Sequence, residues 1–120
     1  MSFLGRLFGR REPAWVWITA QALQAQLATS PRPRLIDVRG PQEFRGPDGH
    51  VPGAENRPLQ DLLANPAALA QEPRPIVLIC LTQIRSGKVA DALAAAGVKH
   101  LAVVQGGMKA WQAAGLPVER

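Results

Sequence analysis

The chain contains a single cysteine, Cys80, among its 120 residues, so it cannot form an internal disulfide. A lone thiol is typical of a reducing compartment, and we expect a cytoplasmic protein. Histidine is also scarce, with two residues in the chain, and no cluster of carboxylates accompanies them. This argues against a structural zinc site, and we expect neither a metal nor any other cofactor.

Long apolar runs and basic stripes are missing as well. No stretch of the sequence is long enough to span a membrane, so we expect no stable membrane insertion. The formal net charge is +5, but three of these charges, Arg6, Arg10 and Arg11, fall within the first eleven residues, which hold no acid. Because no basic stripe with interleaved aromatic residues appears, we expect no nucleic-acid partner.

The first thirteen residues form a candidate basic arm, and residues 14–120 form the predicted domain. The arm combines its arginines with four large apolar residues: Phe3, Leu4, Leu7 and Phe8. It lacks the long apolar run and the small-residue cleavage site of a secretory signal. Two interpretations stay open, a loosely packed terminus or a short amphipathic arm for a protein partner or a membrane surface.

The chain does contain a regular alternation of apolar runs and helical patterns. Its length and its hydrophobic fraction of 47% suggest one domain with one core. Strands are predicted at residues 15–18, 35–38, 54–56, 76–79 and 100–104. Helical segments are predicted after a cap at Thr19 and at residues 41–44, 59–63, 66–69, 86–96 and 108–114. Strands that alternate with helices indicate an α/β layer fold with a mainly parallel sheet.

Cys80 directly follows the apolar run 76–79, which is typical of a central parallel strand. Sites in such sheets gather beyond the carboxyl ends of the strands. The turn that follows can point successive N–H groups inward as an anion-binding nest, and the next helix adds a partial positive charge. Both effects favour the thiolate, which is the nucleophile. Arg85 adds a permanent charge, so the layout suits a cysteine that attacks an anionic substrate and holds a group covalently.

Each of these two residues also has a simpler interpretation. A cysteine after an apolar strand is often a small buried hydrophobic residue. An arginine at the start of a helix is often only solvated. The surroundings of Cys80 alone therefore leave catalytic and structural roles open.

Three blocks of the sequence resemble the signatures of the rhodanese-like domain family. The first comprises Asp37-Val38-Arg39, Glu43-Phe44, residues 49–56 and Pro58-Leu59. The second runs from Cys80 to Ser86, and the third comprises residues 106–111 and 115–118. The resemblance covers residues 15–118, with the blocks in the family's order.

The resemblance implies a small α/β domain with about five mostly parallel strands and helices on both faces. It also implies a sulfurtransferase, in which Cys80 takes sulfane sulfur from a donor such as thiosulfate and becomes a persulfide. Cyanide or a thiol would then accept the sulfur. The implied substrate-binding residues are Leu81, Thr82, Gln83, Ile84, Arg85 and Ser86. Asp37 and Arg39 would support the loops through hydrogen bonds.

Two features differ from many members of that family. Gln83 stands where many family loops have glycine, whose backbone freedom glutamine lacks, and Gln83 and Ile84 give a bulky, uncharged rim that predicts poor use of thiosulfate. Residues 45–48 also lengthen the connection between Glu43 and His50, which is expected to alter access or to contact a partner.

Other functions stay open beside the sulfurtransferase. A non-catalytic or regulatory binding module would dock a protein partner, with Cys80 as a sensor or a bystander. An oxyanion enzyme such as a phosphatase is the third hypothesis, but the related phosphatases carry one more residue in the loop. His50 is interpreted as part of a structural turn, and Gly106-Gly107 lacks the third glycine of a dinucleotide fingerprint.

Overall fold

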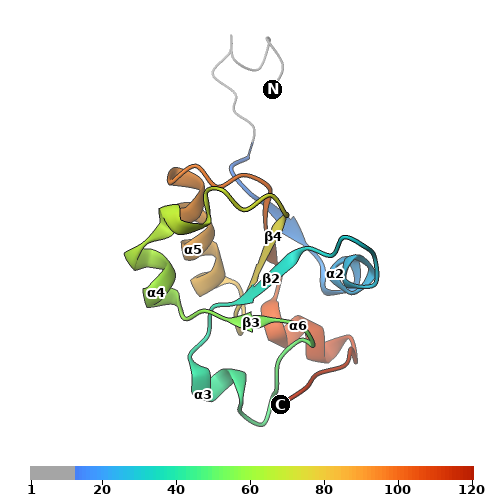
Figure 1. The fold of residues 1–120 in the computed structure, drawn as a ribbon. Coiled ribbons are helices and arrows are strands. Elements are labelled where there is room, and N and C mark those ends of the chain that lie inside the picture. The colour runs from blue at the N-terminus through green and yellow to red at the C-terminus, as the bar shows by residue number, and fades with distance from the viewer. Residues whose placement is uncertain (1–12) are drawn as a thin grey trace.

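The structure is a computed structural model that describes residues 13–120, so the predicted basic arm lies outside the described residues except for Pro13. Figure 1 shows a central sheet with helices packed on both sides. The elements follow in the order β1 (Val16–Ile18), α2 (Ala20–Leu27), β2 (Arg34–Asp37), α3 (Pro41–Phe44), β3 (Glu55–Asn56), α4 (Leu59–Ala64), η1 (Pro66–Leu69, a 3₁₀ helix), β4 (Ile76–Ile79), α5 (Ile84–Ala95), β5 (Leu101–Val104) and α6 (Gly107–Ala113).

The five strands form one sheet in the order β1-β5-β4-β2-β3, and every neighbouring pair is parallel. The predicted α/β fold with a mostly parallel sheet is therefore confirmed. Strand β4 lies in the middle, between β5 and β2, and all four of its residues are buried. Its carboxyl end thus opens at the centre of one edge of the domain, where sites of parallel sheets form.

Alternating side chains of the strands build a separate core on each face of the sheet. On one face, Ile36, Leu78 and Val103 pack with residues of α4, η1 and α5, namely Leu62, Leu69, Val89 and Leu93. On the other face, Leu35, Val77 and Ile79 pack with residues of α2 and α6, namely Leu23, Met108 and Trp111. Helices therefore cover both faces, as predicted, and Figure 1 shows α4 and α5 on the side opposite α2.

Two helix starts illustrate where local sequence decides the structure and where it does not. Helix α2 begins after the predicted cap, and the Thr19 hydroxyl accepts a hydrogen bond from the Ala22 N–H at 3.1 Å. Helix α5, predicted to begin at Ser86, begins two residues earlier at Ile84. The Gly87 N–H donates to the Gln83 carbonyl at 2.9 Å, which closes the first turn of α5. Arg85 and Ser86 therefore belong to this first turn rather than to a free loop.

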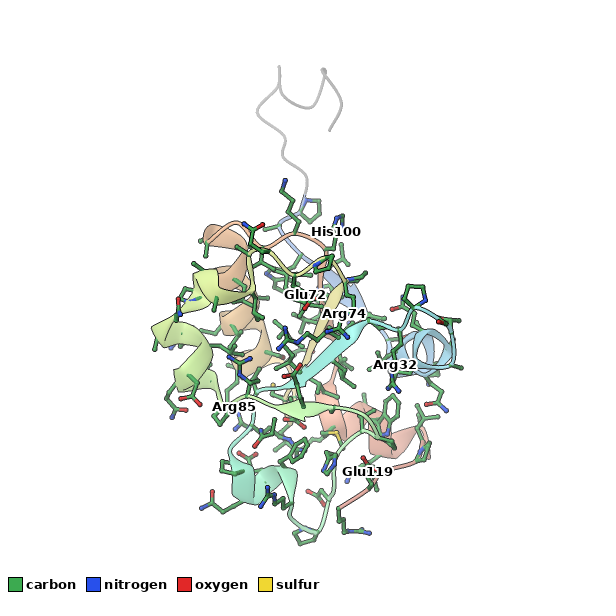
Figure 2. All side chains as sticks on the ribbon, in the orientation of Figure 1. Arg32, Glu72, Arg74, Arg85, His100 and Glu119 are labelled. Atoms are coloured by element: carbon green, nitrogen blue, oxygen red, sulfur yellow. The ribbon has the colours of Figure 1, made fainter. Side chains whose placement is uncertain are left out.

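A network of ion pairs lies at the opposite, amino end of the strands. Arg34 pairs with Glu55 of β3 and with Glu72, which also binds Arg74. Hydrogen bonds from Arg74, and then from Arg34, lower the pKa of Glu72 to about 2. Figure 2 shows Glu72 and Arg74 together and Arg85 apart from them. No helix within residues 13–120 has the length and apolar character that a membrane span needs.

Candidate active site

Cys80 is the first residue after β4, and the start of α6 holds the loop that it begins. The Met108 N–H donates to the Cys80 carbonyl at 2.8 Å, and the Lys109 N–H donates to the Leu81 carbonyl at 3.0 Å. These bonds turn two loop carbonyls toward α6. The amino end of one helix thus fixes the backbone conformation of the loop that precedes another.

Gly107 makes this close approach of α6 feasible. Its φ is +54°, and a Cβ atom on it would overlap the carbonyl oxygens of Cys80 and Thr82. Only glycine combines this backbone conformation with so little volume. Gly107 belongs to the third family-like block, but the sequence does not reveal its contact with the Cys80 loop.

The sulfur of Cys80 is buried but has polar neighbours. The residue is 1% exposed and belongs to the core cluster on the α5 face. Its Sγ lies 3.2 Å from the Ser86 hydroxyl and accepts a hydrogen bond from the Ser86 N–H at 3.4 Å. The burial matches the interpretation of a cysteine as a small hydrophobic residue, whereas the contacts with Ser86 match the interpretation of a nucleophile.

The loop also presents donors without acceptors. Within the part of the chain that the structure describes, the backbone N–H groups of residues 82–85 donate to no acceptor of the protein. Such groups are expected in the first turn of a helix, where no intrahelical carbonyl is available. The next N–H group, that of Ser86, donates to the sulfur of Cys80, so this first turn of the helix is a place where negative charge near the sulfur can be stabilised.

The guanidinium of Arg85 is already paired, because the carboxylate of Glu43 in α3 binds both of its Nη groups. The Arg85 Nη1 and Nη2 groups donate to the two Glu43 carboxylate oxygens at 2.7 and 2.9 Å. These hydrogen bonds lower the pKa of Glu43 and raise that of Arg85. The side chains are 41% and 35% exposed, so the pair lies at the surface of the site.

Asp37 and Arg39 form a buried ion pair, with exposures of 0% and 1%. The Arg39 Nη2 group donates to Asp37 Oδ2 at 2.8 Å and to the Gly49 carbonyl at 2.9 Å. The Asn56 amide donates to the carbonyls of both Asp37 and Arg39. The pair therefore connects the end of β2 to the residues that follow α3 and to β3.

Gln83 corrects one expectation from the sequence. Its φ is −159°, outside the left-handed region that favours glycine, so the expected backbone cost of glutamine is not present. Its side-chain carbonyl instead accepts a hydrogen bond from the Gly106 N–H at 3.0 Å. Glutamine thus adds a third link between the Cys80 loop and the turn before α6, which a glycine could not provide.

The lengthened connection after α3 lines a pocket of about 300 Å³ beside the loop. The pocket is lined by Arg39, Gln42, Glu43, Gly46, Pro47, Asp48 and Leu81. His50, at the end of this connection, stacks on Phe44 and contacts the Phe44 carbonyl through Nδ1 at 2.7 Å, in agreement with a structural turn. Among residues 13–120, no three His, Cys, Asp or Glu side chains are placed to hold a metal ion.

All three family-like blocks therefore meet around the carboxyl end of β4, with Glu43 from the first, Cys80 and Arg85 from the second and Gly107 from the third. The family model of the rhodanese-like domain matches residues 19–114. The chain belongs to the rhodanese-like domain family.

Relatives of this rhodanese-like domain include proteins with and without a named activity. An uncharacterized protein of Synechocystis is 41% identical over 103 residues, which cover 85% of this chain but only 55% of the relative. The thiosulfate sulfurtransferase GlpE of Vibrio cholerae is 29% identical over 102 residues, which cover 85% of this chain and 92% of GlpE. The solution structure of the rhodanese-like domain of the Anabaena Alr3790 protein superposes with a TM-score of 0.74 at 28% identity, covering 91% of this chain and 80% of that one.

The structure brings most residues assigned from the sequence into one region of this rhodanese-like domain. Residues 80–86 form the loop and the first turn of α5. Asp37 and Arg39 lie beside that region and form one buried pair. Glu43 was recognised only as part of a sequence block, and its partner could not be found from the sequence, since Arg85 lies 42 positions away. Ile84 points to solvent with 79% exposure and contributes an apolar rim.

Proposed function

We propose that this domain is a sulfurtransferase that carries sulfane sulfur on Cys80. The observation that carries the proposal is the position of Cys80 at the carboxyl end of the central strand, followed by the open N–H groups of residues 82–85. The family includes thiosulfate sulfurtransferases such as GlpE of Vibrio cholerae, and this likeness supports the same class of reaction.

The reaction has two transfers of one sulfur atom. The Cys80 thiolate attacks the outer sulfur of the donor, a new S–S bond forms, and the donor's S–S bond breaks with its electron pair on the leaving fragment. With thiosulfate, the leaving fragment is sulfite. The acceptor, cyanide or a thiolate, then attacks the outer sulfur of the persulfide, and the Cys80 thiolate leaves. No external oxidant or reductant is needed.

The loop residues have distinct roles in this proposal. The backbone N–H groups of residues 81–86 would stabilise the negative charge of the persulfide, as the Ser86 N–H, which already donates to Cys80 Sγ, illustrates. Arg85 helps to hold the donor, and Asp37 and Arg39 support the neighbouring backbone. Because Cys80 is buried, access of a donor requires the surrounding loop to move. A cytoplasmic location would supply thiols as acceptors.

Intact-mass analysis tests the proposal directly. Incubation with thiosulfate or an organic persulfide should add the mass of one sulfur atom, and subsequent cyanide should remove it. Cys80→Ser is the control and should gain no sulfur. Undiminished turnover by Cys80→Ser, or no added mass with any donor, would exclude this mechanism.

A binding module is the second candidate function, and two observations favour it. Cys80 is buried, and Ile84 exposes a large apolar side chain next to it, as a docking surface would. The rate of Cys80 alkylation as a function of pH separates the candidates. Fast alkylation near neutral pH supports the nucleophile, whereas a rate that rises only near pH of about 8.5 supports the module.

A further inference from the structure

The ion pair between Arg85 and Glu43 assigns a donor class to the proposed sulfurtransferase. We propose that Glu43, by neutralising Arg85, makes the site select organic persulfides, with at most one negative charge at the reacting end, over the dianion thiosulfate. This inference rests on the proposed function, because it concerns the donor of the same Cys80 site. Glu43 acts here as a specificity-determining residue and does not touch the reacting atoms.

The geometry shows that the positive charge of Arg85 is already matched. Glu43 occupies both Nη groups of Arg85, at 2.7 and 2.9 Å, in the fork arrangement that is strongest for this pair of groups. Glu43 is also held from its own helix, since the Gly40 N–H donates to Glu43 Oε1 at 3.3 Å. A carboxylate fixed from two sides offsets the charge of the guanidinium, so Arg85 attracts a doubly charged donor less strongly than an unpaired arginine would.

Among the residues that line the neighbouring pocket, no basic side chain is unpaired. Its lining includes two carboxylates, Glu43 and Asp48, and its single basic residue, Arg39, is already paired with Asp37. Thiosulfate would carry two negative charges into these surroundings and toward a thiolate. Lys88 and Lys109 lie on the adjoining helices, and Arg120 donates to the Pro47 carbonyl at 2.9 Å. All three side chains are exposed, and charges in water are strongly screened.

The rim of the loop suits a carbon-bearing donor. Residues 82–84, Thr82, Gln83 and Ile84, carry no charge, and Ile84 is 79% exposed. An organic persulfide, R–S–SH, can place its R group against this side chain. The Cys80 thiolate then bonds to the outer sulfur, the donor's S–S bond breaks, and R–S⁻ leaves with the electron pair, while the proton stays on the Cys80 persulfide or passes to R–S⁻.

Single-turnover loading of Cys80, followed by intact mass, tests the assignment with two donors. The probes are thiosulfate and the persulfide of 2-mercaptoethanol. The wild type should load from the persulfide at least about tenfold faster, a difference equivalent to about 1.4 kcal/mol in the barrier. Glu43→Gln keeps an acceptor for the Gly40 N–H but removes the negative charge. This variant should load from thiosulfate at least about tenfold faster than the wild type. Its rate of loading from the persulfide should change less than about threefold.

Glu55→Gln is the matched control. Glu55 also binds an arginine, Arg34, through both carboxylate oxygens, and is similarly exposed at 40%, but it lies in the network at the amino end of the strands. This variant changes the net charge equally and should leave both loading rates unchanged. If Glu43→Gln fails to fold, as circular dichroism would reveal, Asp48→Asn removes the other carboxylate of the pocket and should raise thiosulfate loading about twofold.

The outcomes separate this inference from the proposed function. Faster loading of the wild type from thiosulfate than from the persulfide would overturn the inference, and so would an unchanged thiosulfate rate in folded Glu43→Gln. Both results would leave Cys80 as the sulfur carrier. Loading from neither donor would instead overturn the proposed function itself.

Discussion

Substitution of Gly107 by alanine tests whether α6 holds the Cys80 loop in its conformation. Gly107 has a φ of +54°, and an alanine Cβ would overlap two loop carbonyl oxygens. The left-handed backbone costs alanine about 1–2 kcal/mol. Overlap with packed backbone adds about 1–3 kcal/mol, because either the loop or α6 must shift. The expected loss of stability is therefore about 2–5 kcal/mol.

Gly115→Ala is the matched control for the backbone term. Gly115 has a φ of +69°, but among residues 13–120 no heavy atom other than those of its chain neighbours lies within 4 Å of the Cβ position. Its substitution should cost only about 1–2 kcal/mol. In a domain of this size, 1 kcal/mol lowers Tm by about 4 °C, so we expect a loss of about 4–8 °C for Gly115→Ala and about 8–20 °C for Gly107→Ala.

The two variants should also differ in chemistry. A shift of the Cys80 backbone by about 1 Å misplaces the nucleophile and should reduce sulfur loading about 100-fold, measured below the melting range. Gly115→Ala leaves the loop untouched and should load normally. Equal melting temperatures for the two variants, together with normal loading by Gly107→Ala, would refute the role assigned to α6.

Three further substitutions address the ion pairs. Asp37→Asn leaves its buried guanidinium partner without a counter-charge and should cost about 3–5 kcal/mol in urea denaturation; a loss below about 1 kcal/mol would contradict the importance of that pair. Glu72 has its pKa lowered from 4.5 to about 2, chiefly by hydrogen bonds from Arg74, so its carboxylate contributes stability that is present above pH 4.5 and lost as the pH falls toward 2. As the pH falls through that window, the free energy of unfolding should therefore decrease less in Glu72→Gln than in the wild type. Identical dependences of this free energy on pH would argue against a stabilising role of the Glu72 carboxylate. Arg85→Ala leaves Glu43 unpaired beside the site and should weaken thiosulfate binding by about 1.5–3 kcal/mol, measured from the concentration dependence of loading; unchanged affinity would show that Arg85 does not influence the donor.

Much of the fold could be predicted because local patterns decide it. Four consecutive apolar residues marked β4, and the helical segments predicted at residues 41–44 and 66–69 match the bounds of α3 and η1. Both segments begin with a proline, which suits a first helical position. The start of α5 was wrong by two residues, since its first turn depends on the angles of Gln83 and on the contact of its side chain with Gly106. Such a long-range contact leaves no local signal in one sequence.

The reactive residues of the site could be predicted from the sequence, but the contacts between them and the rest of the fold could not. Position after the central strand identified Cys80, and spacing identified Arg85 and Ser86. The sequence left the burial of the sulfur open, and it did not reveal the pairing of Arg85 with Glu43, which depends on how α3 and α5 come together in space. For the same reason, Arg85 was expected to bind the donor, with no carboxylate of the protein as its partner.

Two unequal restraints hold the Cys80 loop, and the difference indicates where it opens. On the α6 side, three hydrogen bonds, from Gly106, Met108 and Lys109, hold residues 80–83, each worth about 0.5–1.5 kcal/mol. On the α3 side, one partly exposed ion pair holds Arg85, and exposed pairs contribute about 0–1 kcal/mol. The weaker side should yield first, so a reagent should reach the buried sulfur past Glu43. Alkylation of Cys80 by iodoacetamide should accordingly be faster in Glu43→Gln than in the wild type, and an equal rate would place the opening elsewhere in the loop.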